Sequence, residues 1–210
     1  QLRDQTAAEP VGYRVMRIAT HHAARSRGLG SALLSRCHDE FGDSVDWFGV
    51  GFGATPRLLS FWRANGYRPV HFSVTRNETS GEHSALMLRP CSTAGNDLAD
   101  RHSRWFRDRI AGQLADTLSG VAPDVIRGVL RAVSVSVDDD ELGTLDVADR
   151  GWRVLAGVAY GPGTYEAAPH VFRQLAMAHL IRPVAELSPR AERLLVRKVL
   201  QCAPWATVAD

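Results

Sequence analysis

The chain has 210 residues, which allows one or two domains, and its apolar (45%) and charged (23%) fractions are ordinary for a soluble globular protein. It has no apolar run long enough to span a bilayer and no signal peptide at its start, so we expect a cytoplasmic protein without a membrane partner. The net charge of +2 is too small to indicate nucleic-acid binding by itself. Lys198 is the only lysine, and a GC-rich genome explains that arginine bias as readily as phosphate recognition does.

The cysteines indicate neither disulfides nor a metal. Cys37, Cys91 and Cys202 lie far apart, without a CxxC pair or a His/Cys cluster at zinc spacing. This usage fits a reducing cytoplasm, and we expect no metal. Because the chain begins at Gln1 rather than Met, we expect it to be a piece of a longer polypeptide.

The first ninety residues predict alternating strands and helices. Apolar residues recur at helical spacing after a glycine turn, and Thr55-Pro56 supplies a cap and a first helical residue for a second helix that ends at Asn65-Gly66. The expected order is strand 13–20, helix 29–41, strand 45–52, helix 55–65, strand 67–74, hairpin loop 75–82 and strand 84–89. This order predicts an α/β (α+β) domain with parallel pairing first and a terminal hairpin.

After Pro90 the composition changes. We expect a domain over residues 1–91, a small, polar linker over 92–97, and a mostly helical tail domain over 98–210. Within the tail the patterns predict helices over 98–118, 123–133 and 188–202, an Asp-rich turn at 138–140, and a mixed region over 152–180 that is broken at Gly161-Pro162-Gly163.

The loop Arg25-Ser26-Arg27-Gly28-Leu29-Gly30 joins the first strand to the first helix. Such a turn points backbone N–H groups and the positive end of a helix dipole at one spot, which favours an anion. A plain tight turn is the simplest alternative. A dinucleotide fingerprint needs a third glycine where Leu33 stands, and a P-loop needs a lysine after its glycine, where Ser31 stands. The remaining R-x-x-G-x-G pattern resembles motif A of the GNAT acetyltransferases, which holds the pyrophosphate of acetyl-CoA.

Longer strings narrow the resemblance. Residues 17–21 (RIATH), 51–55 (GFGAT) and 61–63 (FWR), together with Arg76 and Ser80-Gly81, are similar to the tRNA(Met) cytidine acetyltransferases, whose eukaryotic members are the RNA cytidine acetyltransferases. The resemblance is specific over about residues 12–96 and weaker over the tail. It implies a partial GNAT acyl-CoA N-acyltransferase fold, from its fourth strand onward, followed by a truncated tRNA-binding tail domain.

The resemblance also implies partners and chemistry. The reaction would transfer acetyl from acetyl-CoA to the N4 amine of cytidine in RNA, at the wobble cytidine of elongator methionine tRNA, with ribosomal RNA as another substrate class. ATP would bind only to an upstream helicase-like module of the same polypeptide, because this chain has no P-loop. The alternatives are a GNAT enzyme that acetylates protein or small-molecule amines, and a catalytically silent RNA-binding fragment.

The family's acetyl-CoA contacts fall on three segments of this sequence. The first segment would offer backbone groups to the pantetheine amide, and the second is the glycine loop. The third lies on the helix after the GFGAT string. A bacterial member of the family has an arginine at the position of Ala64, and the arginine of this sequence stands one position earlier, at Arg63. The residues are Ile18, Ala19, Thr20, Arg25, Ser26, Arg27, Gly28, Leu29, Gly30, Ser31, Arg57 and Arg63.

His21 is the candidate proton acceptor, because histidine titrates near neutrality and matches the family string; the alternative is a strand-end histidine bonded to the backbone. Phe61 and Trp62 are expected in the core rather than as stacking platforms. Basic residues on the hairpin and on two tail helices form candidate RNA contacts, with solvated surface arginines as the alternative. They are Arg76, Arg101, Arg104, Arg190, Arg193 and Arg197.

Overall fold

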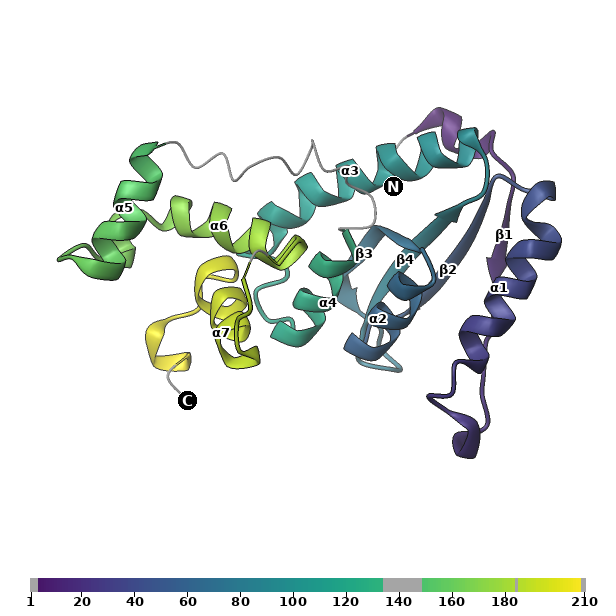
Figure 1. Ribbon diagram of the computed structural model, residues 1–210, viewed down its shortest axis with the longest axis horizontal. Coiled ribbons are helices and arrows are strands. Elements are labelled where there is room, and N and C mark those ends of the chain that lie inside the picture. Colours follow the sequence, from purple (N-terminus) through teal and green to yellow (C-terminus); the bar gives the residue numbers. More distant parts are fainter. Residues whose placement is uncertain (1–3, 134–148, 184, 209–210) are drawn as a thin grey trace. The chain divides into compact units, whose positions relative to one another are not determined.

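The computed structural model describes residues 4–133, 149–183 and 185–208 (Figure 1). The chain divides into two compact units, Gln1–Arg107 and Asp108–Asp210. The boundary falls inside one continuous helix, α3 (Thr93–Gln113). Among the described residues, no helix combines the length and the apolar character that a bilayer crossing requires.

The first unit is built on a mixed four-stranded sheet. Its strands are β1 (Gly12–Val15), β2 (Trp47–Gly53), β3 (Arg68–Arg76) and β4 (His83–Pro90), in the spatial order β1-β2-β4-β3. The β1/β2 pair is parallel, and the β2/β4 and β3/β4 pairs are antiparallel. The predicted α/β class, with parallel pairing first and a terminal hairpin, is therefore confirmed.

Two helices cover the same face of this sheet. Phe48 packs against His38 of α1 (Leu29–Phe41), with ring centroids 4.8 Å apart, and Phe52 packs against Trp62 of α2 (Pro56–Ala64), with centroids 6.0 Å apart. Because side chains four residues apart on a strand point to one face, both helices lie on that face. Both helices begin and end within a residue of their predicted bounds, and Thr55 caps α2 by accepting a hydrogen bond from the Leu58 N–H at 3.3 Å. Short 3₁₀ turns occupy Gln5–Ala8, His22–Ala24 and Gly42–Ser44.

The first strand is shorter than predicted. It ends at Val15, opposite Val50, whereas the sequence pattern indicated a strand through Thr20. Alternation shows which residues suit an extended chain but not where a partner strand stops following it. Residues 16–20 therefore leave the ladder, and in the described sheet β1 has a neighbour on one side only.

The segment expected to be a linker is helical. α3 begins at Thr93, where Ser92 Oγ accepts a hydrogen bond from the Gly95 N–H at 3.1 Å, and it ends at Gln113 rather than 118. Small, polar residues are typical of both linkers and helix starts, and Ser92 serves here as the cap. The Ser92 hydroxyl also donates to Asp46, 2.5 Å away, which anchors the start of α3 beside β2.

The second unit is helical, as predicted. It contains α4 (Pro123–Val133), α5 (Asp149–Tyr160), α6 (Pro169–Ile181), α7 (Pro189–Leu194), a π-helical segment (Leu195–Leu200) and 3₁₀ turns at Tyr165–Ala167 and Trp205–Thr207. The predicted Asp-rich turn at 138–140 lies outside the described residues. Apolar residues of α4, α6 and the π-helical segment form the core of this unit, including Ile126, Leu130, Leu180, Val196 and Leu200.

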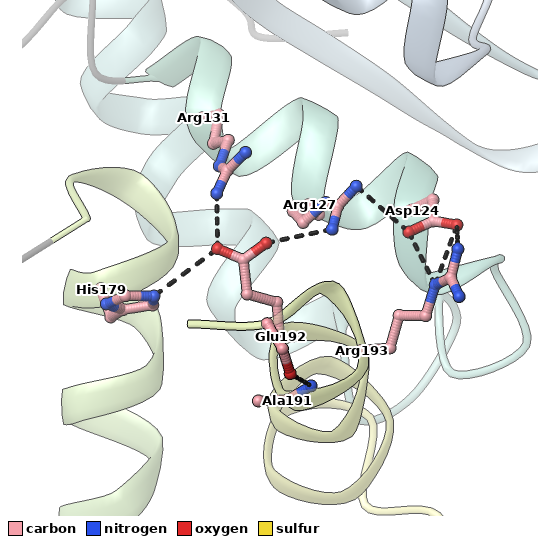
Figure 2. A network of polar contacts seen from close by, with 8 residues as sticks. Asp124, Arg127, Arg131, His179, Ala191, Glu192 and Arg193 are labelled. Atoms are coloured by element: carbon pink, nitrogen blue, oxygen red, sulfur yellow. Dashed lines mark hydrogen bonds and ion pairs between the residues drawn. The ribbon is translucent and has the colours of Figure 1, made fainter. Parts of the chain in front are cut away.

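A buried carboxylate joins three helices of the second unit (Figure 2). Glu192 of α7 is only 4% exposed. It accepts hydrogen bonds from Arg127 at 3.0 Å and Arg131 at 2.5 Å, both on α4, and its Oε1 lies 3.6 Å from Nε2 of His179 on α6. Nearby, Arg193 forms a bidentate pair with Asp124 at the more exposed start of α4.

Removing the two carboxylates should have unequal effects. We expect Glu192→Ala to lower the free energy of unfolding by about 3 kcal/mol, because it leaves two guanidinium groups without their buried partner. Asp124→Ala is the control and should cost at most about 1 kcal/mol, since solvent screens that pair. Urea denaturation, followed by far-UV circular dichroism, measures the free energy of unfolding of both variants. Equal losses of stability would contradict the expected difference between the buried and the exposed ion pair.

Candidate functional site

A cavity of about 600 Å³ opens between the segment after β1, the glycine loop, the start of α1 and one side of α2. Ten of the twelve residues predicted to bind acetyl-CoA lie on it. Its lining consists of Ile18, Ala19, Thr20, Ala24, Arg25, Ser26, Gly28, Leu29, Gly30, Ser31, Arg57, Leu58 and Phe61.

The loop backbone has an unusual conformation. Ser26 and Gly28 have φ values of 59° and 78°, both in the left-handed region. Gly28 occupies the N-cap position of α1 and has no side chain with which to cap the helix. The first backbone N–H groups of a helix lack intrahelical acceptors, so those of α1 face the cavity uncapped. Left-handed Gly28 leads directly into the right-handed residues of α1. Such a pairing of conformations turns successive N–H groups inward, which makes an anion-binding concavity.

Gly30 allows a close contact between α1 and α2. A Cβ atom at this position would lie 3.3 Å from two ring atoms of Phe61. The hydrogen that glycine carries instead lets the Phe61 ring pack directly onto the first turn of α1. Phe61 thereby forms a wall of the cavity.

The charge of the lining favours an anion. Arg25 comes from the loop and Arg57 from α2, and the thirteen lining residues, all within the described part of the chain, include no acid. Arg57 reaches the loop directly, because its Nη2 lies 3.4 Å from Ser26 Oγ. Arginine on two sides of a nest of N–H groups suits a diphosphate, whose oxygens accept several hydrogen bonds.

Ile18, Ala19 and Thr20 form the other wall. They lie in the segment that has left the sheet, so no strand in the described part of the chain pairs with their backbone. An extended segment with unpaired N–H and C=O groups can hydrogen-bond to an amide-containing ligand as a strand does.

The cavity lining differs from the predicted acetyl-CoA contacts at five positions. Arg27 and Arg63 are exposed and do not line the cavity. Ala24, Leu58 and Phe61 line it but were not predicted as ligand contacts. The helical spacing from Arg57 to Phe61 could have identified the last two. Trp62 is 2% exposed, which confirms its prediction as a core residue, whereas Phe61 is shared between packing and the cavity.

His21 lies beside the cavity rather than on its lining. Its Nδ1 accepts a hydrogen bond from the Ala23 N–H at 3.4 Å, which caps a short 3₁₀ turn, and its ring lies 4.2 Å from that of His22. In this conformation the lone pair of Nδ1 faces the backbone, so the neutral ring carries its proton on Nε2. His21 would have to release the turn before Nδ1 could accept a proton from another group.

Several arginines predicted to contact RNA have partners within the protein. Arg101 donates to Asp4 and to Thr6, both at 3.1 Å, and Arg193 pairs with Asp124. Arg197 donates to the Ser119 carbonyl at 3.3 Å. Arg76, Arg104 and Arg190 are exposed, and Arg76 and Arg104 also have interactions within the protein.

The Arg193 pair changes the acidity of its partner. The guanidinium hydrogen bonds lower the pKa of Asp124, which therefore stays ionised. A phosphate that recruited Arg193 would have to replace this carboxylate.

The strand order, the left-handed glycine loop and the basic cavity at the α1 N-terminus define an acyltransferase domain of the GNAT class. The family model for GNAT acetyltransferase 2 matches residues 31–92. The predicted GNAT fold is therefore confirmed, and the chain contains a GNAT acetyltransferase domain.

Relatives place this domain in a longer protein. The chain is 59% identical to tRNA(Met) cytidine acetyltransferase TmcA of Haloferax volcanii and 52% identical to that of Haloarcula marismortui, in both cases over 100% of this chain and 27% of the relative. It is 38% identical to that of Methanopyrus kandleri, over 95% of this chain and 23% of the relative. The chain is homologous to the C-terminal part of the tRNA(Met) cytidine acetyltransferases, as its motifs predicted, and spans about a quarter of their length.

The loop conformation makes a prediction about two glycines. Gly28→Ala should lower the free energy of unfolding by about 1 kcal/mol or more, because alanine resists the left-handed conformation. Gly42→Ala is the control: Gly42 has φ of −61° and open space around its Cα, so alanine should be neutral or stabilising there. Thermal or urea denaturation of the two variants tests this, and equal destabilisation would refute the argument.

Proposed function

We propose that this chain is the acetyl-transferring part of an RNA cytidine acetyltransferase, acting from acetyl-CoA on the N4 amine of a cytidine. The observation that carries the proposal is the cavity at the start of α1, whose lining coincides with the positions that resemble the family's acetyl-CoA contacts. The homologous proteins are named tRNA(Met) cytidine acetyltransferases, which supports a tRNA as the substrate. We propose the wobble cytidine of elongator methionine tRNA as the target.

The chain's residues fit a coenzyme A diphosphate. Arg25 and Arg57 would neutralise its charge, the N–H groups at the start of α1 would bind its oxygens, and residues 18–20 would hold the pantetheine arm by backbone hydrogen bonds. When bound, acetyl-CoA supplies an acetyl thioester as the acyl donor. The work of the protein is to bring that group and the amine together, since the cytidine N4 lone pair is delocalised into its ring.

The acceptor amine must lose one proton as its bond to the acetyl carbon forms, and the departing thiolate takes up one proton. His21 follows the wall formed by residues 18–20, and we propose it as the group that accepts the proton from the amine. Exposed Arg76, Arg104 and Arg190 are our candidates for RNA contacts, because phosphate contacts need accessible charge.

One labelling experiment tests the function. The 210-residue chain, and the same chain extended upstream, would be incubated with acetyl-CoA labelled in its acetyl group together with tRNA or total cell protein. We expect label in tRNA, on N4 of cytidine, with the extended chain. Label in protein would support an amine-acetylating GNAT enzyme. RNA retention without transfer by either form would support a silent RNA-binding fragment.

Substitution of His21 tests the proposed proton acceptor. In the extended enzyme, His21→Ala should lower the single-turnover rate of cytidine acetylation by about 10² or more, the usual contribution of a positioned base. His22→Ala is the matched control and should change the rate little. Wild-type single-turnover rates for His21→Ala would remove this residue from the mechanism.

A further inference from the structure

One amide side chain connects the two helices that wall the cavity. Asn65 follows the last residue of α2 and is half-buried. Its Nδ2 donates to the Phe61 carbonyl at 2.8 Å and to Ser31 Oγ, on the first turn of α1, at 3.1 Å. Ser31 and Phe61 both line the cavity, although Asn65 does not.

The Phe61 carbonyl decides which way the Asn65 amide points. A carbonyl oxygen only accepts, so the group facing it must be the NH₂ and not the amide oxygen. The same NH₂ is the group that faces Ser31. The Ser31 oxygen therefore accepts from Asn65, and the hydroxyl hydrogen has to point elsewhere.

The direction left to that hydrogen includes the cavity. Ser31 is the third residue of α1, where the uncapped N–H groups gather, and it is half-exposed. A hydroxyl that accepts from an amide and donates to an anion extends the donor set of the helix N-terminus by one group. Hydrogen bonds that involve an ionised partner are the stronger ones.

We propose that Asn65 is a positioning residue for the coenzyme A site: by donating to Ser31, it orients the Ser31 hydroxyl to donate to the diphosphate. This inference rests on the proposed function, because it presumes a diphosphate at the start of α1. It adds a residue that lies outside the cavity and acts only through Ser31.

A double-mutant cycle on the 210-residue chain tests the proposal. The dissociation constant for coenzyme A is measured by calorimetry for the unchanged chain, Asn65→Ala, Ser31→Ala and the double variant. Each single variant should bind about tenfold more weakly, the scale of one hydrogen bond to a charged group. The double variant should be no weaker than Ser31→Ala, since Asn65 has nothing left to orient.

A second ligand separates positioning from structural damage. S-acetylpantetheine lacks the diphosphate, so its affinity should be the same for all four proteins. Asn96→Ala is the matched control: Asn96 also donates from Nδ2 to the carbonyl four residues earlier, that of Ser92, at 3.0 Å, but it lies on α3. It should leave coenzyme A binding unchanged.

Other outcomes overturn the proposal. Additive losses in the cycle, or an equal loss for S-acetylpantetheine, would mean that Asn65 supports the fold through Phe61. If Asn65→Ala does not fold, the affinity of Ser31→Ala for coenzyme A tests the proposal by itself. A wild-type affinity in that variant would show that the Ser31 hydroxyl does not donate to the diphosphate. If the unchanged chain does not bind coenzyme A, the proposed function fails as well.

Discussion

The uncapped N-terminus of α1 is the feature on which the candidate site depends. A Ser, Thr, Asp or Asn side chain at the N-cap accepts a hydrogen bond from one of the first N–H groups of a helix, but Gly28, which has no side chain, stands at that position here. The donors are left for a ligand, and Arg25 and Arg57 place positive charge around them. This arrangement gains its stability only when an anion is bound, so the protein must hold α1 in place by other means.

Buried contacts behind the site provide that hold. His38, on the buried side of α1, lies 3.1 Å from the Tyr67 hydroxyl and packs edge-on against Phe48 of β2. Burial raises the pKa of the Tyr67 phenol, which therefore stays neutral and can donate to the histidine ring. Tyr67 is fully buried, and its ring also packs against Trp62 of α2, with ring centroids 4.8 Å apart. The sheet thus fixes the direction in which α1 points its free donors.

The parts of the site predicted from the sequence are those set by local chemistry. The glycine loop, the Thr55 cap and the bounds of α1 and α2 each depend on neighbouring residues. The length of β1 was missed because it depends on how far β2 follows it. The helical start of α3 was missed because Ser92 is bound by Asp46, a residue 46 positions away. Contacts between distant residues also gave Asn65 its link to Ser31.

The basic residues of the tail also depend on contacts between distant residues. A stripe of arginines predicts a phosphate-binding surface only if their charges are available. Arg197 donates to the Ser119 carbonyl, 78 residues earlier in the chain. Arg193 pairs with Asp124, while Arg127 and Arg131 both bind the buried carboxylate of Glu192 (Figure 2). Much of the tail's positive charge therefore stabilises its helix packing. An exposed arginine such as Arg190 presents its charge at the surface, so we expect RNA recognition by the tail to depend on such residues.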